Sequence, residues 1–490
     1  MNFNSLTFLI YYPIVLLLYF ILPLKIRWIM LLAASYFFYM SWNASLLFLI
    51  LFTTLISWIC SLVIEKTDSL FKKRLCLIIT LIVSLGILFF FKYYNFLAQS
   101  VSGLMTLFGA PAQDYTLNLI LPVGISFYTF QTLSYAIDVY RGDVKTEHHF
   151  GYYALFVSFF PQLVAGPIER PDNLLPQLKT PNRPNAEDAA AGLKRMMVGF
   201  FKKVVVADLL AGYVNAVYND AANATGAGII IATCMFAVQI YCDFSGYTDI
   251  AIGCARVMGI RLMQNFDRPY SARSIKEFWA RWHISLSTWF RDYLYIPLGG
   301  SRCSKARHMT NLMIVFLVSG LWHGADWTFV IWGFLHGAYQ IIGHLTLGAR
   351  KKLTDRMHIN RESCGFRIYQ TVITFVLVTF AWMFFRANNT ADLLVLLEKL
   401  FTAWTVPLGE VMAGMGLTWT GVLVSVLSAA CMVVFDRLVV HNEAPMADGS
   451  LRSTIAVGGG KAVAAVWCIM LAWLILLAGD GASSFIYFQF

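Results

Sequence analysis

Charged side chains are scarce in this chain of 490 residues. Asp, Glu, Lys and Arg make up 13% of it, whereas hydrophobic residues make up 58%. Soluble domains carry roughly 25% charged residues, so this composition excludes an ordinary soluble enzyme. The sequence predicts an all-α polytopic membrane protein, with residues 1–490 forming a single membrane domain and no separate soluble domain.

Recognisable cysteine and metal-ligand patterns are also missing. No two of the nine cysteines form a C-x-x-C pair, and most lie inside apolar runs. We therefore expect buried thiols rather than a disulfide framework or a metal site. His336 and His344 fall on one apolar segment, but no further ligands accompany them at a suitable spacing. For these two histidines we predict packing or cavity lining.

Apolar runs long enough to cross a bilayer recur along the chain. A helical span needs roughly 20 residues, and we expect between about ten and fourteen membrane-embedded helices. The full-length candidates are 6–24, 45–63, 76–97, 117–137, 226–252, 326–346, 368–385, 420–436 and 462–479. The shorter or interrupted ones are 28–42, 151–165, 193–215 and 308–321.

Positive charge is concentrated in the connections between these runs. The formal net charge is +10, and Lys and Arg cluster in 66–74, 170–203, 256–307 and 349–367. Short basic loops of this kind mark the cytoplasmic face of a membrane protein. The positive charge therefore predicts an orientation in the membrane, and we expect no binding of nucleic acid.

Residues 275–290 place apolar side chains at helical spacing among polar ones. This stretch is too short and too polar to span a membrane, so it predicts one amphipathic helix at the cytoplasmic interface. His283 and Ser287 are four residues apart and would face protein or water rather than lipid. The apolar side chains of the stripe are Ile275, Phe278, Trp279, Trp282, Leu286, Trp289 and Phe290.

His323 lies in a short polar stretch between the apolar segments 308–321 and 326–346. Basic residues flank the outer ends of both segments, so this turn points away from the cytoplasmic surface. A helix over 308–321 would be only about 21 Å long, against a bilayer core of roughly 30 Å. We therefore expect the turn to stop inside the membrane, where it contacts protein or lines an aqueous cavity.

Placing an imidazole at that depth costs free energy, so the ring needs an interaction partner or has a functional role. Because its ordinary pKa is roughly 6.5, His323 is suited to act as a general base. Trp322 would form an apolar wall, and Asp326 could orient the ring. The alternative is a structural histidine that is hydrogen-bonded between helices. For His283, next to Trp282, an interfacial anchor is the favoured interpretation, and a functional role is the alternative.

Two carboxylates interrupt the apolar segment 226–252. Exposing Asp243 or Asp249 to lipid would cost much free energy, so these side chains must face a cavity or pair with cations. Arginines of the stretch 256–281 are the candidate partners. Structural pairing and a role in a substrate passage, with Tyr247 between the two carboxylates, both remain open.

A series of motifs, in order along nearly the whole chain, resembles the membrane-bound O-acyltransferase (MBOAT) superfamily. The branch is that of bacterial alginate and peptidoglycan O-acetyltransferase membrane subunits, to which the teichoic-acid D-alanylation membrane protein is related. The motifs are FFPQLVAGPI at 159–168, DFSGY at 243–247, FWARWHISLS at 278–287, RDYLYIPLGG at 291–300, LWHG at 321–324 and FIYFQF at 485–490.

The resemblance implies a ring of transmembrane helices with short re-entrant and interfacial helices around a central tunnel. It also implies a multi-pass protein of the bacterial inner membrane. His323 matches the catalytic histidine of the family, and His283 occupies a second position near it. The residues expected along the tunnel are Trp322, Asp326, Trp282, Ser287, Asp243, Tyr247 and Asp249.

The implied reaction moves an acyl group, expected to be acetyl, from a cytoplasmic thioester to hydroxyls of an extracytoplasmic polysaccharide. The donor would be acetyl-CoA or another acyl thioester, whose phosphates would meet Arg281, Arg291 and Lys276. His323 would accept the hydroxyl proton, and His283 would polarise the carbonyl or hold the donor. Transfer would be direct or would use an extracytoplasmic acetyltransferase or esterase-like partner. No metal is expected.

Two other functions fit the same residues. Buried charges and broken helices would also suit a transporter of a polysaccharide precursor or an anion, although the sequence shows no internal repeat. A protein or lipid O-acyltransferase of the same superfamily, with a peptide or sterol acceptor, is the other alternative.

Overall fold

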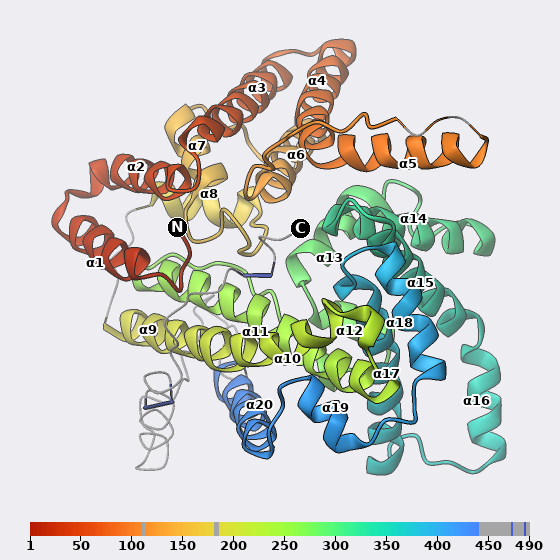
Figure 1. Cartoon of the computed structure of the whole chain (residues 1–490). Coiled ribbons are helices and arrows are strands. Elements are labelled where there is room, and N and C mark those ends of the chain that lie inside the picture. Colours follow the sequence, from red (N-terminus) through yellow and green to blue (C-terminus); the bar gives the residue numbers. More distant parts are fainter. Residues whose placement is uncertain (110, 112, 181–185, 441–471, 474–484, 487–490) are drawn as a thin grey trace. The chain divides into compact units, whose positions relative to one another are not determined.

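The structure is a computed structural model that describes residues 1–109, 111, 113–180, 186–440, 472–473 and 485–486. Within these ranges the chain forms helices joined by loops, with no strand (Figure 1). Contacts divide it into two compact units, each of which is described by itself. The first unit contains Met1–Met196 and Tyr247–Met263, and the second contains Met197–Gly246 and Gln264–Ile486. A single domain over residues 1–490 stays a prediction.

The first unit consists of helices from the first half of the chain. The contacts between α3, α4 and α6 form its main helix packing. Its α-helices are α1 (Leu6–Ile21), α2 (Arg27–Met40), α3 (Leu47–Lys66), α4 (Leu70–Leu88), α5 (Tyr94–Leu107), α6 (Ile125–Arg141), α7 (Phe150–Ser158), α8 (Pro171–Lys179) and most of α9 (Ala186–Phe200). A π-helical turn, η3 (Phe89–Tyr93), joins α4 to α5.

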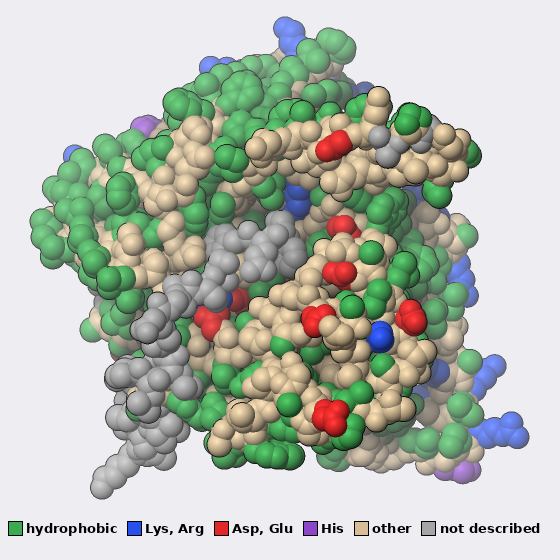
Figure 2. Space-filling model, viewed as in Figure 1, with side chains coloured by type: hydrophobic (Ala, Val, Ile, Leu, Met, Phe, Trp, Pro, Cys, Tyr) green, Lys and Arg blue, Asp and Glu red, His purple; other side chains and the backbone are tan. Residues whose placement is uncertain are grey.

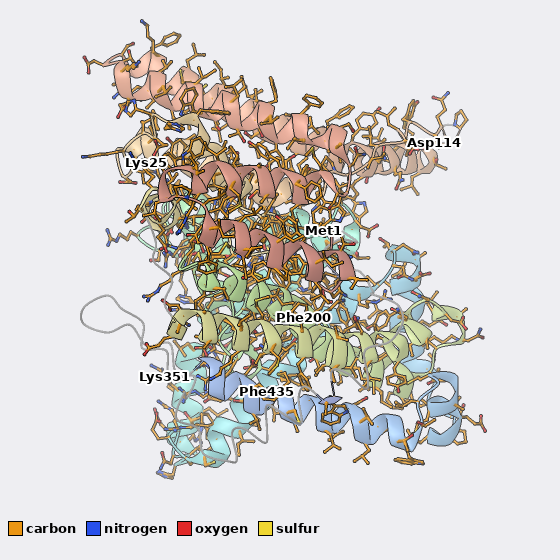
Figure 3. The ribbon with its side chains drawn as sticks, turned by 90° about the vertical axis from the view of Figure 1, so that its left-hand side faces the viewer. Met1, Lys25, Asp114, Phe200, Lys351 and Phe435 are labelled. Atoms are coloured by element: carbon orange, nitrogen blue, oxygen red, sulfur yellow. The ribbon has the colours of Figure 1, made fainter. Side chains whose placement is uncertain are left out.

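The second unit holds the remaining helices. Its π-helical turns are η4 (Phe201–Ala207) and η7 (Arg291–Tyr295), and its 3-10 turns are η5 (Ala221–Asn223) and η6 (Pro269–Ser271). Phe435 of α20, labelled in Figure 3, packs on Phe201 with ring centroids 5.3 Å apart. The α-helices are α10 (Asp208–Tyr218), α11 (Gly226–Val257, shared with the first unit), α12 (Ile275–Arg281), α13 (Ile284–Phe290), α14 (Lys305–His323), α15 (Trp327–Leu345), α16 (Leu347–Arg356), α17 (Cys364–Arg386), α18 (Thr390–Thr402), α19 (Leu408–Gly414) and α20 (Trp419–Val440).

Five helical segments of the described chain are long and apolar enough to cross a membrane. They are Ala44–Lys66, Leu70–Leu107, Gly226–Val257, Cys364–Arg386 and Trp419–Asp436. Large apolar side chains cover the outside of the helices (Figure 2), and Phe71 on α4, for example, is 74% exposed. Lipid is the solvent that such side chains suit. The candidate segment 462–479 lies almost wholly outside the described residues, and the expected ten to fourteen embedded helices stay a prediction.

The expected helix over 117–137 begins later than predicted. Pro122 and Gly124, whose φ is 75°, precede the first residue of α6, Ile125. Residues 117–124 are therefore not helical, and α6 continues instead to Arg141.

The helix that ends at His323 is longer than its apolar run. Ser304 accepts a hydrogen bond from the backbone N–H of Arg307 and so begins α14 ahead of the apolar residues. The helix has 19 residues, or about 28 Å at 1.5 Å per residue. The predicted helix of only about 21 Å is wrong, and helix length no longer argues that the turn stops inside the membrane.

The single amphipathic helix predicted over 275–290 is also wrong, because two helices occupy this stretch. α12 ends at Arg281, and α13 begins at Ile284. Between them His283 adopts a left-handed backbone with φ 44°. The break is held in place from another segment, since Asn265 accepts a backbone hydrogen bond from Ile284 at 2.9 Å.

Candidate functional site

The site is built at the C-terminal end of α14, where this helix packs against α15. Figure 1 shows α14, α15 and α17 side by side in the second unit. Two glycines allow the close approach of α14 and α15. A Cβ atom on Gly320 would lie 2.3 Å from the carbonyl oxygen of Phe329, and one on Gly333 would lie 2.3 Å from that of Phe316. Small residues of this kind let helix backbones meet.

His323, the last residue of α14, is surrounded by aromatic rings. Its ring centroid lies 4.9 Å from that of Trp322, 5.0 Å from Trp332 of α15 and 5.4 Å from Phe385 of α17. All three contacts are edge-on, which is a favoured geometry for aromatic pairs. The side chain is buried, with 4% of its surface exposed. The protein therefore holds this imidazole in one orientation within an apolar wall.

His283 contacts the same group of rings from the break between α12 and α13. Its ring centroid lies 6.5 Å from that of His323 and 5.8 Å from that of Trp322. The side chain is fully buried, at 0% exposure. The structure thus brings the two histidines expected in the site together, with Trp322 in contact with both.

The contacts of His283 indicate its tautomer. Its Nδ1 lies 3.2 Å from Oδ1 of Asn265, and a carboxamide oxygen can only accept a hydrogen bond. The hydrogen therefore sits on Nδ1, and Nε2 keeps the basic lone pair. The backbone N–H and the hydroxyl of Ser285 donate to the same oxygen, at 3.2 and 2.9 Å. Burial lowers the pKa of His283 to about 3, so the ring is neutral.

Asp326 does not orient the ring of His323. Its carboxylate accepts a hydrogen bond from the backbone N–H of Thr328 at 2.8 Å and so caps the start of α15. The other described contact of this carboxylate is with the hydroxyl of Thr390, at 3.5 Å. The carboxylate fixes the helix that follows the histidine, and the expected place of Asp326 along the tunnel stays a prediction.

Trp282 and Ser287 lie beside the site. The Trp282 ring stacks on Phe278, with centroids 5.5 Å apart, and contacts Trp382 at 5.0 Å. The hydroxyl of Ser287 donates to the Trp282 carbonyl at 3.3 Å. His283 caps the start of α13, the helix that carries Ser287, and the shared face expected for these two residues stays a prediction. Both Trp282 and Ser287 help to hold the turn between α12 and α13.

The Asp243 carboxylate is buried in an ion-pair cluster of the second unit. It lies 2.7 Å from Nζ of Lys203, which also lies 2.8 Å from Asp208. The backbone N–H of Ile486 donates to the same carboxylate at 2.8 Å. The adjacent Lys202 pairs with Asp436 of α20 at 2.6 Å.

Asp249 and Tyr247 belong to the first unit. Asp249 pairs with Nε of Arg195 at 3.0 Å, and Tyr247 stacks on Phe3 with centroids 4.5 Å apart. The structure thus pairs Asp243 with Lys203 and Asp249 with Arg195. Structural pairing is what the described contacts show for both carboxylates.

The three basic residues expected at the donor phosphates lie on or beside α12 and α13. Arg281 pairs with Glu277 at 2.7 Å and donates to Ser271 at 2.9 Å. Arg291 is 59% exposed and pairs with Asp292 at 2.7 Å. Lys276 is exposed. Their contact with a donor stays a prediction.

Sequence reasoning missed Asn265 and Trp332 of the site. Asn265 lies outside every motif, and no spacing rule connects it to His283. Trp332, Trp279 and His336 have indole or imidazole nitrogens in the same interior, and all three side chains are buried. The expected packing role of His336 is confirmed, because its ring contacts those of Trp279 and Trp332 at 5.1 and 4.9 Å.

Comparison with known proteins gives a family match and several relatives. Residues 37–391 match the membrane-bound O-acyltransferase family. The chain is 39% identical to the probable alginate O-acetylase AlgI of Pseudomonas aeruginosa over 89% of this chain and 81% of that protein. It is 37% identical to the peptidoglycan O-acetyltransferase of Helicobacter pylori, over 74% of this chain and 72% of that protein. It is also 31% identical to the teichoic acid D-alanyltransferase of Streptococcus thermophilus, over 52% of this chain and 64% of that protein.

The family match spans well over half of the chain and includes both site histidines, the Asn265 partner and the aromatic rings around them. On this evidence the chain belongs to the membrane-bound O-acyltransferase family.

Proposed function

We propose that this protein transfers an acetyl group from a cytoplasmic thioester, such as acetyl-CoA, to hydroxyls of an extracytoplasmic polysaccharide. The observation that carries the proposal is the placement of His323 against His283 inside a ring of aromatic side chains. Relatives named for acetylation of alginate and of peptidoglycan support a polysaccharide acceptor. The location is the bacterial inner membrane.

His323 is the general base of this reaction. It accepts the proton of the acceptor hydroxyl as the oxygen attacks the thioester carbonyl, and it later returns the proton to the departing thiolate. The apolar wall of Trp322, Trp332 and Phe385 excludes bulk water, which would otherwise compete with the acceptor for the acyl group.

His283 assists as a hydrogen-bond acceptor. Because its Nδ1–H is directed to Asn265, only the Nε2 lone pair faces other groups. A neutral ring of this tautomer cannot donate to a carbonyl oxygen. Of the two roles expected for His283, holding a substrate is therefore favoured over polarising the carbonyl.

The two substrates reach the site from opposite sides of the membrane. Lys276, Arg281 and Arg291 form a basic patch suited to the phosphates of the donor. The acceptor is an extracytoplasmic glycan hydroxyl, or a serine of an extracytoplasmic acetyltransferase or esterase-like partner that completes the transfer.

The test replaces His323 with Ala and measures the acetyl content of cell-envelope glycans and exopolysaccharide. His344→Ala is the matched control, because His344 is an exposed histidine on α15. We expect loss of acetylation in the first variant and normal acetylation in the second, at equal protein abundance in the membrane. Normal acetylation in His323→Ala would contradict the acyltransfer proposal and favour a transporter. Unchanged glycan acetylation in a deletion strain would instead favour a protein or lipid acceptor.

A further inference from the structure

A third buried histidine lies in the interior next to the site, on α15. His336 is fully buried, at 0% exposure. The indole N–H of Trp279 donates to its Nδ1 at 3.2 Å. An indole can only donate, so Nδ1 of His336 carries no hydrogen, and the neutral ring holds its hydrogen on Nε2. Trp279 thereby fixes His336 as a donor through Nε2, which is the opposite tautomer to that of His283.

Several ring N–H groups of the described residues in this interior, that of Trp282 among them, have no acceptor. Neither Nε2 of His336 nor Nε1 of Trp332 has a hydrogen-bond partner among the residues that the structure describes, although both atoms are buried. Leaving a buried donor unpaired costs free energy, so each such group in a native protein calls for an explanation. The two residues are one helical turn apart on α15, and their ring centroids are 4.9 Å apart.

These donors adjoin the general base. The Trp332 ring contacts His323 at 5.0 Å and His336 at 4.9 Å, so a single indole touches both imidazoles. The ring of Trp382 on α17 stacks on the Trp332 ring, with centroids 5.7 Å apart. The rings are therefore held in fixed positions before any substrate enters.

The chemistry of these atoms favours an oxygen ligand. Two N–H donors without an acceptor fit an oxygen atom that has lone pairs to share. They do not fit a metal cation, because Nε2 of His336 is protonated and Nδ1 is already bonded to Trp279. The proposed reaction provides such an oxygen in the thioester carbonyl, and the N–H of His283 already donates to Asn265.

We propose that Trp332 and His336 bind the thioester carbonyl oxygen and stabilise the negative charge that this oxygen acquires. This inference rests on the proposed acyl transfer. The acceptor oxygen forms a bond to the carbonyl carbon while His323 takes its proton, and the carbonyl π electrons move onto the oxygen between the two donors. When that electron pair returns, the carbon–sulfur bond breaks, and the thiolate leaves with the proton from His323.

Fixed donors in a water-excluded site are an effective way to stabilise developing charge. A protonated histidine or a lysine at this position would have to be kept charged in an apolar interior, at a large desolvation cost. Neutral indole and imidazole donors avoid that cost. Trp279 acts here as a positioning residue, because its hydrogen bond selects the tautomer of His336.

The test compares His336→Asn and Trp332→Phe with the wild-type protein in purified membranes or detergent. Asn offers a carboxamide oxygen near the place of Nδ1, so it can still accept from Trp279, but it lacks the distal N–H. Phe keeps an aromatic ring and lacks the indole N–H. We expect each variant to lower kcat by about 10²–10³-fold, while KM for the thioester changes little.

Matched controls use the same substitutions outside the site. His344→Asn changes an exposed histidine of α15, and Trp404→Phe removes an indole N–H that donates to the carbonyl of Leu400. Both should keep the wild-type kcat. A thioether analogue of the donor, with a methylene in place of the carbonyl, should inhibit the wild-type protein and both site variants equally.

Each outcome decides between the proposals. If His323→Ala abolishes transfer but His336→Asn and Trp332→Phe keep their kcat, or change only KM or thermal stability, the carbonyl-binding role is overturned while the acyltransferase stands. If His323→Ala retains full transfer, the proposed function itself fails. Rates are expressed per folded molecule, so that a variant of lower abundance still gives a result.

Discussion

Asn265 holds His283 in place across a gap of 18 residues, with Nδ1 of the histidine 3.2 Å from the carboxamide oxygen. The same oxygen accepts hydrogen bonds from the backbone and the hydroxyl of Ser285. One buried oxygen atom therefore fixes both the tautomer of His283 and the start of α13.

Asn265→Ala removes this acceptor and leaves buried donors unpaired. We expect a loss of about 1–3 kcal/mol in the free energy of unfolding, together with at least a tenfold loss of acyl transfer (roughly 1.4 kcal/mol in the barrier). Thermal denaturation and the transfer rate measure the two effects. Asn173→Ala, at a more exposed side chain, is the control. Wild-type activity in Asn265→Ala would show that the orientation of His283 is unimportant.

The stability of the second unit should depend on pH through His283. Burial holds its pKa at about 3 in the folded protein, below the ordinary value of 6.5. Between these two values the unfolded chain binds a proton that the folded chain does not, so stability falls as the pH is lowered from 6.5. Thermal unfolding from pH 7.5 to pH 5 should show a flatter dependence in His283→Gln than in the wild type. Equal slopes would contradict the neutral, buried state of His283.

Gly320→Ala tests the close approach of α14 and α15. The new Cβ would meet backbone at 2.3 Å, so the helices must separate. We expect destabilisation by about 1–3 kcal/mol and a loss of activity, because His323 ends the displaced helix. Gly343→Ala on α15 is the matched control, since a Cβ there meets nothing within 4 Å. Equal stability of the two variants, measured by thermal denaturation, would refute the helix contact.

The buried pair between Lys203 and Asp243 should be far more sensitive than a surface pair. Removing one partner leaves an uncompensated buried charge, so Lys203→Ala should lose about 3–5 kcal/mol of stability. Arg367→Ala breaks the exposed pair with Glu362 and should lose much less stability, because solvent screens that pair. Denaturation in detergent compares the two variants. Similar small losses would show that the Lys203 pair is open to water.

The sequence predicted the helical membrane class and the two site histidines, because both follow from local signals. Composition identifies the class, and His283 and His323 lie in motifs that resemble a known family. The partner of His283 could not be predicted in the same way. Asn265 approaches it only through tertiary packing, and no periodicity connects a loop residue to the break between two helices.

The errors have physical causes that differ from place to place. The helix over 275–290 was expected to continue because its apolar side chains keep helical spacing throughout, yet His283 takes a left-handed backbone held by distant hydrogen bonds. The start of α14 was placed too late because apolar periodicity outweighed the capping signal of Ser304. Nearby arginines were expected at Asp243, but a π-helical turn brings Lys203 to it instead.

That π-helical turn also bears on the biosynthesis of the protein. Lys202 and Lys203 are consecutive, yet the first bonds to Asp436 of α20 and the second to Asp243 of α11. An apolar segment that carries a lone carboxylate enters a bilayer at a cost. The lysines are synthesised well before α20. The ammonium group of Lys202 is therefore already present when α20 inserts, and it can pair with Asp436 at that stage. The order of translation itself then favours correct assembly.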